Sequence, residues 1–323
     1  MKAIVQRRYG PPEQALTLAE VAQPMPGRDE VLVRVRAASV NALDWHTVEG
    51  KPYVARMSTG RARPKYPIRG VDVAGRVEAV GADVKAIKPG DDVVGWCAGA
   101  FAEYAVASQD QFVGKPAALS YEESAALPVA GVTALQGLRD KGGLTAGQHV
   151  LINGSGGGVG TFAVQIGKAL GAEVTAVSKH VELMNSLGAD HVIDYTREDF
   201  TKVTNRYDLV FDNGASHPLS AVRRTLKAGG TLVLNSGASM PRIAMAIVLS
   251  RMGRRVHIFL AHLNQKDLLY LTGLVNTRQL RPIVDRIFPL EETAAAIAYV
   301  EAGKARGKVI VNVSESLLPR LHG

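Results

Sequence analysis

The glycine-rich run at residues 154–160 is the part of the sequence that most directly indicates a ligand-binding function. It reads Gly-Ser-Gly-Gly-Gly-Val-Gly, follows a short apolar stretch at 149–153 and leads into helical periodicity at 159–170. A strand, a glycine turn and a helix start in this order present backbone N–H groups and a positive dipole end to a pyrophosphate. Glycine is needed because a Cβ would block the turn or the approach of the phosphates. The run therefore predicts a dinucleotide-binding loop.

The run departs from the usual G-x-G-x-x-G pattern at one position. The pattern falls on residues 155–160, where Gly157 and Gly160 match the second and third glycines and Ser155 replaces the first. A match of this kind is weak alone, but it is strong between an expected strand and helix within six alternating units. The alternative is a glycine-rich turn with a structural role only.

The residues after the next expected strand indicate which dinucleotide is bound. A protein that binds NAD usually carries Asp or Glu about 20 residues beyond the glycines, where the carboxylate bonds the ribose 2′-hydroxyl. Here that place holds Ser178-Lys179-His180, and Glu173 lies at the other end of the strand. A hydroxyl and an ammonium group suit a 2′-phosphate, which a carboxylate would repel. We therefore expect NADP(H) rather than NAD(H).

Strands and helices alternate through residues 120–263. Ser120 and Glu123 form a capping box, which predicts that a helix begins just after Ser120. Short apolar runs separated by helical stretches follow at residues 149–153, 173–177, 191–194, 207–212, 231–235 and 256–260. Such runs are typical of a parallel sheet covered on both faces. We expect an α/β fold with a doubly wound, six-stranded parallel domain here.

The two ends of the chain differ from this middle part. Runs at 31–36, 71–80 and 92–95 are strand-like and are separated by glycines and prolines, which indicates a compact antiparallel fold. Beyond residue 264 we expect helices at 266–274 and 291–301 and a last strand at 308–313.

Composition excludes several classes of protein. The 323 residues suffice for about two domains, and the one cysteine, Cys97, excludes an internal disulfide and a four-cysteine zinc site. No apolar run is long enough to span a membrane, and the N-terminus has no signal-peptide pattern, so we expect a cytoplasmic protein. The formal net charge of +8 comes without a nucleic-acid recognition motif, so we expect no nucleic-acid partner.

Taken together, these motifs resemble the zinc-independent branch of the medium-chain dehydrogenase/reductase superfamily, which includes quinone oxidoreductases and NADPH-dependent enone reductases. The resemblance covers nearly the whole chain. The segments that carry it are Ser39–Asp44, Gly70–Gly75, Gly99–Tyr104, Gly131–Ala134, Gly157–Gly160, Leu187–Asp190, Val192–Tyr195, Phe211–Asn213 and Gly307–Ile310. Ala42 stands where the branch has proline in its S-V-N-P-x-D segment.

The resemblance implies two domains and a set of cofactor contacts that is divided between them. Residues 1–119 and 264–323 would form a β-rich GroES-like catalytic domain, and residues 120–263 a Rossmann domain, with NADP(H) in the cleft. The implied contacts are Gly156, Gly158 and Val159 for the pyrophosphate; Ser178, Lys179 and Tyr195 for the 2′-phosphate; Asn213 for the adenosine and ribose side; Asn41 for the nicotinamide ribose; and Thr133, Gly157, Gly160 and Lys308 from the matching segments.

The chain departs from zinc alcohol dehydrogenases at their metal ligands. Asn41 and Val71-Asp72 stand where that branch has a cysteine and the His-Glu pair, and no H-x-x-x-H pair is present. Asn and Val do not replace the ligands that a catalytic zinc requires, so we expect no bound metal. Without a Lewis acid, the favoured acceptors are quinones and α,β-unsaturated carbonyls, which take hydride without one.

Five side chains are weighed as pocket residues. His46 could bond the acceptor oxygen or donate a proton, or it could be a polar wall residue. Tyr53 is the other candidate proton donor, or a loop aromatic. We expect Asp44 to cap a short helix at 45–49, Asp72 to be a buried, paired carboxylate, and Cys97 to be a small buried apolar residue.

Residues 241–255 form an unusual segment, because apolar residues precede Arg251, Arg254 and Arg255. It could be an amphipathic helix that contacts a membrane surface, or it could line the acceptor pocket or a dimer interface. We favour a pocket or interface, and we expect a homodimer from the resemblance.

Two other functions remain open. A 2-enoyl thioester reductase would need a channel for a pantetheine chain and an active Tyr53. A protein that binds NADPH with little turnover, acting as a redox sensor or an RNA-binding protein, would fit the basic clusters.

The assignment of Lys179 to the 2′-phosphate leads to a first prediction. Lys179→Ala should raise the KM for NADPH more than the KM for NADH, because only NADPH carries the phosphate that the ammonium group would bind. Steady-state kinetics with both cofactors measures this. Equal effects on the two KM values would remove Lys179 from the phosphate site.

Overall fold

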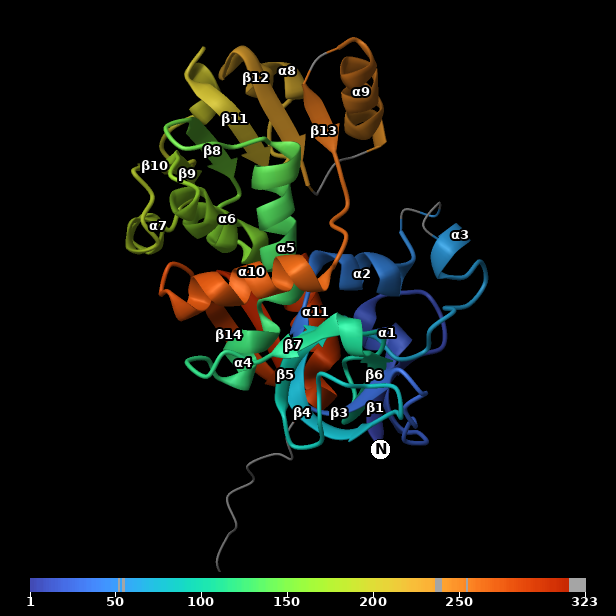
Figure 1. Ribbon diagram of the computed structural model, residues 1–323. Helices are drawn as coiled ribbons and strands as arrows, with labels where there is room; N and C mark the ends of the chain where they lie inside the picture. Colours follow the sequence, from blue (N-terminus) through green and yellow to red (C-terminus); the bar gives the residue numbers. More distant parts are fainter. Residues whose placement is uncertain (52, 54–55, 236–239, 254, 314–323) are drawn as a thin grey trace, which may run out of the picture. The chain divides into compact units, whose positions relative to one another are not determined.

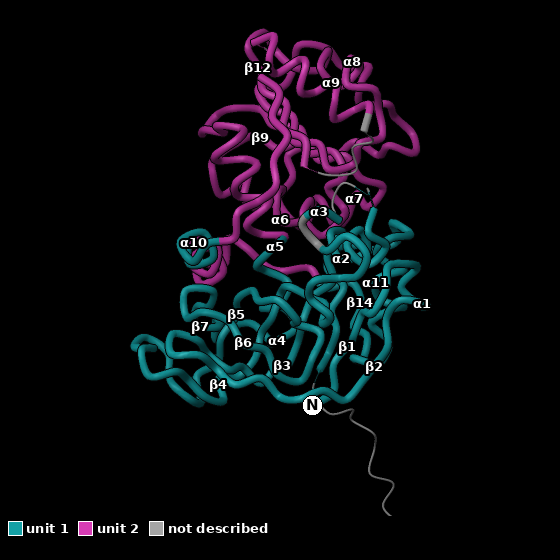
Figure 2. Tube along the Cα trace, turned by 90° about the vertical axis from the view of Figure 1, so that its right-hand side faces the viewer, with its two compact units in different colours: residues 1–129, 264–269, 284–323 teal, residues 130–263, 270–283 magenta. Residues whose placement is uncertain are grey.

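The computed structural model describes residues 1–51, 53, 56–235, 240–253 and 255–313 (Figure 1). The chain forms two compact units (Figure 2): unit 1 is Met1–Val129, Asn264–Leu269 and Val284–Gly323, and unit 2 is Ala130–Leu263 and Tyr270–Ile283. The predicted boundary at 119/120 lies within the first segment of unit 1. Residues 270–283, which we expected in the catalytic domain, belong to unit 2.

Unit 1 is built on β-strands from both ends of the chain. A two-stranded antiparallel sheet pairs β1 (Lys2–Gln6) with β2 (Leu16–Glu20). The larger sheet has the order β14-β15-β3-β4-β5-β7, and β6 also pairs with β3. Its strands are β3 (Glu30–Val40), β4 (Asp72–Val80), β5 (Asp92–Trp96), β6 (Tyr104–Ser108), β7 (Phe112–Gly114), β14 (Val284–Pro289) and β15 (Lys308–Asn312).

Short helices accompany these strands, and the apolar core lies under them. The core includes Val33, Val73, Phe101, Phe112 and Ile297, all nearly inaccessible to solvent. The helices are α1 (Pro12–Ala15), α2 (Ala42–Glu49), α3 (Arg56–Thr59), α4 (Tyr121–Ala125) and α11 (Thr293–Glu301), with 3₁₀ turns at Gln109–Gln111 and Leu290–Glu292. α5 (Pro128–Leu135) and α10 (Gln265–Asn276) each have residues in both units.

Unit 2 holds a six-stranded sheet in which every neighbouring pair is parallel. Its order is β10-β9-β8-β11-β12-β13, the 3-2-1-4-5-6 order of a Rossmann fold. The strands are β8 (His149–Asn153), β9 (Glu173–Val177), β10 (His191–Ile193), β11 (Tyr207–Asp212), β12 (Leu226–Leu234) and β13 (Val256–Ile258). The predicted α/β fold with a doubly wound, six-stranded parallel domain is confirmed.

Helices cover both faces of this sheet (Figure 1). Leu151 and Val210 face a core shared with Leu219 of α8 and Ala246 of α9. Val150 and Val174 point to the opposite face, where they lie against Gly167 of α6. The helices of unit 2 are α6 (Gly158–Ala169), α7 (Val181–Ser186), α8 (Leu219–Arg224) and α9 (Met240–Arg251), with a π-helical turn at Gln136–Lys141 and a 3₁₀ turn at Phe200–Lys202.

Two predicted helix starts have different outcomes. The capping box is confirmed: Glu123 N donates to Ser120 Oγ at 3.1 Å, and Ser120 N donates to the Glu123 carboxylate at 2.8 Å. The prediction that Asp44 caps a helix at 45–49 is wrong, because α2 already begins at Ala42, with Asn41 as its N-cap. Asp44 instead lies at the third position of the helix. Among the described residues, no helix combines the length and apolar character needed to cross a bilayer.

Only glycine fits at position 160, because the backbone of the preceding loop lies directly against it. A Cβ at this position would lie 2.3 Å from the carbonyl oxygen of Gly154 and 2.5 Å from Cα of Ser155. Both neighbours are backbone atoms, which cannot turn away as a flexible side chain can. The third glycine of the pattern therefore allows α6 to start directly against the turn that follows β8.

This close contact predicts that the same substitution, glycine to alanine, changes stability in opposite directions at two helical positions. Gly160→Ala should destabilise the protein by about 1–3 kcal/mol, because overpacking displaces the backbone. Gly273→Ala, in α10, should stabilise it by about 0.5–1 kcal/mol, because a Cβ there meets nothing within 4 Å. Denaturant unfolding of the two variants measures both effects. Equal effects would show that the close approach at Gly160 is not a constraint.

Candidate functional site

The glycine loop of unit 2 starts α6 and leaves room for a ligand. Gly157 is the N-cap of α6, and the N–H groups of the first helical turn have no partners within the helix. A Cβ at Gly157 would meet only the Gly154 carbonyl oxygen, at 3.8 Å, an ordinary contact distance. The protein itself would thus tolerate a side chain at this position. The absence of one fits the close approach of a phosphate to the backbone.

Ser155, which breaks the glycine pattern, ties this loop to the neighbouring strand. It is fully buried, and its Oγ donates to the carbonyl oxygen of Val177 at 2.9 Å. Its backbone N–H donates to the same oxygen at 3.3 Å. The serine therefore fixes the loop against the end of β9, where the selectivity residues follow.

The loop and the end of β9 lie together, as the sequence predicted. A Cβ on Gly156 would lie 2.8 Å from Ser178 Oγ, so these two residues are direct neighbours. Ser178 is buried, and its Oγ accepts a hydrogen bond from His180 N at 3.1 Å, which leaves its hydroxyl hydrogen available as a donor. Lys179 is exposed beside it. Tyr195, beyond β10, is also exposed.

Amides and a carboxylate gather where β8, β11 and β12 end. Asn213 N donates to Asn153 O at 3.0 Å, and Asn213 Oδ1 accepts from Asn235 Nδ2 at 2.8 Å. Asp212 accepts from Asn153 Nδ2 at 2.8 Å and forms an ion pair with Arg242 of α9. Ligands of doubly wound sheets bind at this carboxyl edge. Asp212 and Arg242 were missed by the sequence analysis. Thr133, another expected contact, is buried on α5.

In unit 1, Asn41 is held at both ends of its amide. Its Oδ1 accepts from Lys308 Nζ at 2.6 Å, and its Nδ2 donates to Asp72 Oδ2 at 2.9 Å. Lys308 also donates to the Val40 carbonyl oxygen at 3.1 Å and to Asp72 Oδ2 at 3.4 Å. The three N–H donors of Lys308 are thus directed to protein acceptors. Lys308 therefore holds the amide of Asn41 in one orientation.

Asp72 is buried and paired, which confirms the prediction for this residue. It is inaccessible to solvent and, besides Asn41 and Lys308, accepts from Ser39 Oγ at 2.6 Å and from Val129 N at 2.9 Å. Burial lowers the pKa of Lys308, whereas the nearby carboxylate of Asp72 raises it. A buried ammonium and carboxylate are tolerated because each compensates the other.

Asp44 is a buried carboxyl group next to this pair. It is only 3% exposed, and its Oδ2 accepts the N–H of Asn41 at 2.7 Å. Burial raises its pKa to about 7, Asp72 adds to the increase, and the Asn41 N–H, Lys308 and Arg69 oppose it. The group therefore changes charge near neutral pH.

The two candidate proton donors differ in their surroundings. His46 is half-buried, stacks on Trp45 with ring centroids 3.5 Å apart, and has no hydrogen-bond partner for Nδ1 among the described residues. Burial lowers its pKa and so favours the neutral ring, whereas a backbone hydrogen bond to Lys51 and the charge of Glu49 oppose this shift. Tyr53 is 69% exposed, and the guanidinium of Arg56 lies 4.8 Å from its ring centroid. Only His46 offers a shielded polar atom.

Cys97 has the environment that the sequence predicted. It is 3% exposed, and burial, with a smaller effect of Asp72, raises the pKa of its thiol to about 12. Burial and the raised pKa both disfavour the thiolate, which is the form of cysteine that acts as a nucleophile.

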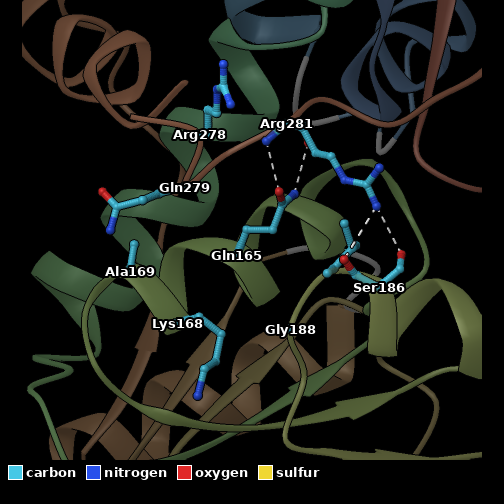
Figure 3. A pocket seen from close by; sticks show the side chains of 9 residues that line it. Gln165, Lys168, Ala169, Ser186, Gly188, Arg278, Gln279 and Arg281 are labelled. Atoms are coloured by element: carbon cyan, nitrogen blue, oxygen red, sulfur yellow. Dashed lines mark hydrogen bonds between the residues drawn. The ribbon is translucent and has the colours of Figure 1, made fainter. Parts of the chain in front are cut away.

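A pocket of about 350 Å³ lies elsewhere in unit 2, at the carboxyl ends of α6, α7 and α10 (Figure 3). Lys168, Arg278 and Arg281 line it. Lys168 forms an ion pair with Asp190 at 2.7 Å, and Arg281 donates to Ser186 Oγ at 3.1 Å. Helix carboxyl ends carry partial negative charge, which these cations offset. The basic lining is thus explained by the helix ends.

The raised pKa of Asp44 predicts the sign of a pH effect on stability. The native state keeps a proton on this carboxyl up to about pH 7, whereas the unfolded chain releases it near 3.8. The contribution of Asp44 to stability is therefore complete below pH 3.8 and is lost as the pH rises through 7. Asp44→Asn keeps an oxygen acceptor for Asn41 N–H and removes this titration.

Between pH 4 and 8, Asp44→Asn should lose less free energy of unfolding than the parent chain, by an amount on the order of a few kcal/mol. Denaturant unfolding at several pH values measures the two curves. Parallel curves would show that Asp44 titrates normally in the folded protein.

Family models match parts of both units. A model described as an alcohol dehydrogenase GroES-like domain matches residues 27–117, and one described as a zinc-binding dehydrogenase matches residues 187–311. Among the described residues, no group of three or more His, Cys, Asp and Glu side chains is arranged to hold a metal ion.

Similar proteins extend the match to nearly the whole chain. A chloroplastic quinone-oxidoreductase, QR1, of Triphysaria versicolor is 34% identical, with 96% of this chain and 98% of the relative covered. A chloroplastic NADPH-dependent alkenal/one oxidoreductase of Arabidopsis thaliana is 32% identical, with 96% and 79% covered. The structure of a quinone oxidoreductase from Coxiella burnetii has 33% identity and a TM-score of 0.86, with 97% and 99% covered.

The match in sequence, length and fold has one consistent explanation. The 3-2-1-4-5-6 parallel sheet of unit 2, the GroES-like match in unit 1 and identities above 30% over almost the full length all agree. The chain belongs to the medium-chain dehydrogenase/reductase superfamily, in its quinone oxidoreductase and enone reductase branch, and is an oxidoreductase of that family.

Proposed function

We propose that the protein is an NADPH-dependent, zinc-independent reductase of quinones or α,β-unsaturated carbonyl compounds. The observation that carries the proposal is the glycine loop of unit 2, with Ser178 and Lys179 beside it and no carboxylate at the end of β9. The names of the relatives support the same chemistry, since one acts on quinones and another is an NADPH-dependent alkenal/one oxidoreductase.

The residues of unit 2 fit the cofactor. The unhindered position at Gly157 leaves space for a pyrophosphate at the start of α6, where N–H groups need acceptors. Ser178, buried against Gly156, can donate its hydroxyl hydrogen, and the exposed Lys179 supplies positive charge. Together they favour a 2′-phosphate, whereas NAD selectivity needs an acceptor for a 2′-hydroxyl.

The residues of unit 1 would orient the cofactor and the acceptor rather than activate them chemically. When bound, the nicotinamide supplies the hydride. Asn41, fixed by Lys308 and Asp72, keeps one N–H and one oxygen lone pair for the nicotinamide ribose. His46 is the candidate hydrogen-bond partner for the acceptor oxygen, since its Nδ1 is shielded and unpaired among the described residues. Tyr53 remains the alternative proton donor.

The donor set at the expected metal position supports zinc independence. Asn41 has a neutral amide, which already bonds Lys308 and Asp72, where a zinc site has a thiolate, and Val71 offers no ligand atom. Asp72 is already paired with an ammonium group, which would repel a dication beside it. The family model described as a zinc-binding dehydrogenase covers residues 187–311 and so includes none of these positions. These residues do not fit a catalytic zinc.

Cofactor oxidation tests the proposal. Loss of the near-UV absorbance of NADPH is followed with a simple quinone and a simple enone as separate acceptors, and with NADH as the control. We expect turnover that prefers NADPH, and the better acceptor identifies the chemistry. Tight NADPH binding without turnover of either acceptor would contradict the proposal and favour a thioester reductase or an NADPH sensor.

The same assay after dialysis against a chelator tests whether the activity depends on a bound metal ion. Activity should be unchanged, because no residue at the expected position is free to bind zinc. Activity that falls and returns on addition of zinc would contradict zinc independence while leaving the reductase activity in place.

A further inference from the structure

The segment that follows α2 carries positive charge without any acid. Residues 50–71 contain six Lys and Arg residues and no Asp or Glu. The acids that border this segment already have partners, because Glu49 pairs with Lys51 at 3.4 Å and Asp72 is buried against Lys308. An excess of one sign without a local counter-charge gives this part of unit 1 a positive field.

Arg56 fixes the start of this segment on α2. Its Nε donates to the carbonyl oxygen of Gly50 at 2.9 Å, and its Nη2 donates to that of Glu49 at 3.2 Å. It thus caps the carboxyl end of α2. Its guanidinium also lies 4.3 Å from the ring centroid of Tyr9 and 4.8 Å from that of Tyr53. Because Arg56 is the first residue of α3, this short helix lies beside α2 (Figure 1, Figure 2).

Two side chains near the N-terminus hold the rest of the segment. Tyr9 Oη donates to the carbonyl oxygen of Gly60 at 2.6 Å. Gln6, the last residue of β1, accepts from Arg69 Nε at 2.5 Å and donates through Nε2 to the carbonyl oxygen of Val48, on α2, at 2.7 Å. Both ends of the segment are therefore held in unit 1, next to α2 and β1.

Between these anchors, three cations remain exposed. Arg61, Arg63 and Lys65 are exposed, and they form no ion pair with any residue that the structure describes. Two apolar side chains accompany them, since Met57 is 75% and Tyr66 is 53% exposed. The basic arm, defined as residues 56–66, thus offers both positive charge and apolar contact area. Such a surface fits a molecule that has an apolar part and an anionic end.

An anionic group on the acceptor is the best match for the basic arm. The arm is held on α2, which carries His46 and follows Asn41, the candidate partners of the acceptor and of the nicotinamide ribose. The phosphates of the cofactor have their proposed partners in unit 2, at the glycine loop. A nucleic acid is bound through many phosphate contacts, more than three exposed cations on one short segment provide.

We propose that the basic arm selects acceptors in which the reducible group is joined by an apolar chain to an anionic end. Arg61, Arg63 and Lys65 bind the anion, and Met57 and Tyr66 contact the chain. The anionic end takes no part in the reduction, so it changes the binding of the acceptor and leaves the chemistry as it is. This inference rests on the proposed function, because it names the class of acceptor for that reaction.

Steady-state kinetics with matched enones tests the proposal. Three enones have the same reactive group and the same saturated chain, which ends in a methyl group, a carboxylate or a phosphate. We expect kcat/KM to be higher for an anionic end than for the methyl end, on the order of tenfold, and salt to reduce this preference. The better of the two anions identifies the group that the arm binds.

The outcomes separate this proposal from the proposed function. Equal kcat/KM for all three enones, or a higher value for the methyl end, would overturn the selection of anionic acceptors and leave the reductase activity in place. An absence of turnover with every enone and with a simple quinone would overturn both.

Paired variants assign the preference to the basic arm. Arg61→Gln with Arg63→Gln should lower the ratio of kcat/KM for the anionic enone to that for the methyl enone, by roughly three- to tenfold. Arg61→Lys with Arg63→Lys keeps the charge and should keep most of the ratio. The matched control, Lys85→Gln with Lys88→Gln, removes the same charge at exposed positions after β4 and should behave as the parent does. An equal loss in the control would show an effect of net charge alone and overturn the assignment.

Two further measurements on the glutamine variants exclude other causes. All four positions are exposed, so the thermal midpoints should match that of the parent, and a matching midpoint excludes unfolding as the cause of a loss. The KM for NADPH should also match that of the parent. A raised KM for NADPH in Arg61→Gln with Arg63→Gln would assign the arm to the phosphates of the cofactor and overturn the proposal.

Discussion

The carboxylate of Asp72 is the group on which the arrangement of unit 1 depends. It accepts hydrogen bonds from Ser39 on β3, from Asn41 before α2, from Lys308 on β15 and from the backbone at Val129. A fully buried charge is tolerated only when it is paired and hydrogen-bonded, so every one of these partners must be in place. Lys308 is 236 residues away in sequence, and its pairing with Asp72 therefore requires the last strand to return beside the first ones. The orientation of Asn41 is a consequence of that return.

The parts of the fold that depend on local signals could be predicted. The apolar runs at 149–153, 173–177 and 207–212 coincide with β8, β9 and β11, because their length and flanking residues already distinguish strand from helix. Their parallel pairing could be predicted because helical stretches separate them, as in a sheet built from strand–helix–strand units. The strand pairs of unit 1 could not be derived in this way. β3 pairs with β4, β6 and β15, and no local pattern records which distant strand supplies the partner.

The residues of the candidate site also differ in whether a local sequence signal predicts them. The glycine loop and the end of β9 were predicted together because a parallel βαβ unit brings its strand ends to one edge. The error at Asp44 was avoidable, since Asn41 is a good N-cap and an acidic residue three positions later can bond the N-cap N–H. The Asp212–Arg242 pair gave no such signal, because its members are 30 residues apart and meet only through the crossover from β12 to α9.

The positive charges at the two ends of α9 lie in different surroundings. Arg242 lies at the start of α9, beside Asp212 at the carboxyl edge of the sheet, whereas Arg251 lies nine residues further along the helix. At 1.5 Å per residue this places Arg251 roughly 13 Å away along the helix axis. Arg242 is neutralised by its pairing with Asp212, and the exposed charge of Arg251 is screened over a Debye length of about 8 Å at physiological ionic strength, so it has little effect at the sheet edge. The selectivity for a 2′-phosphate that we propose would then come from local groups such as Ser178 and Lys179, with no contribution from the arginine at the far end of α9.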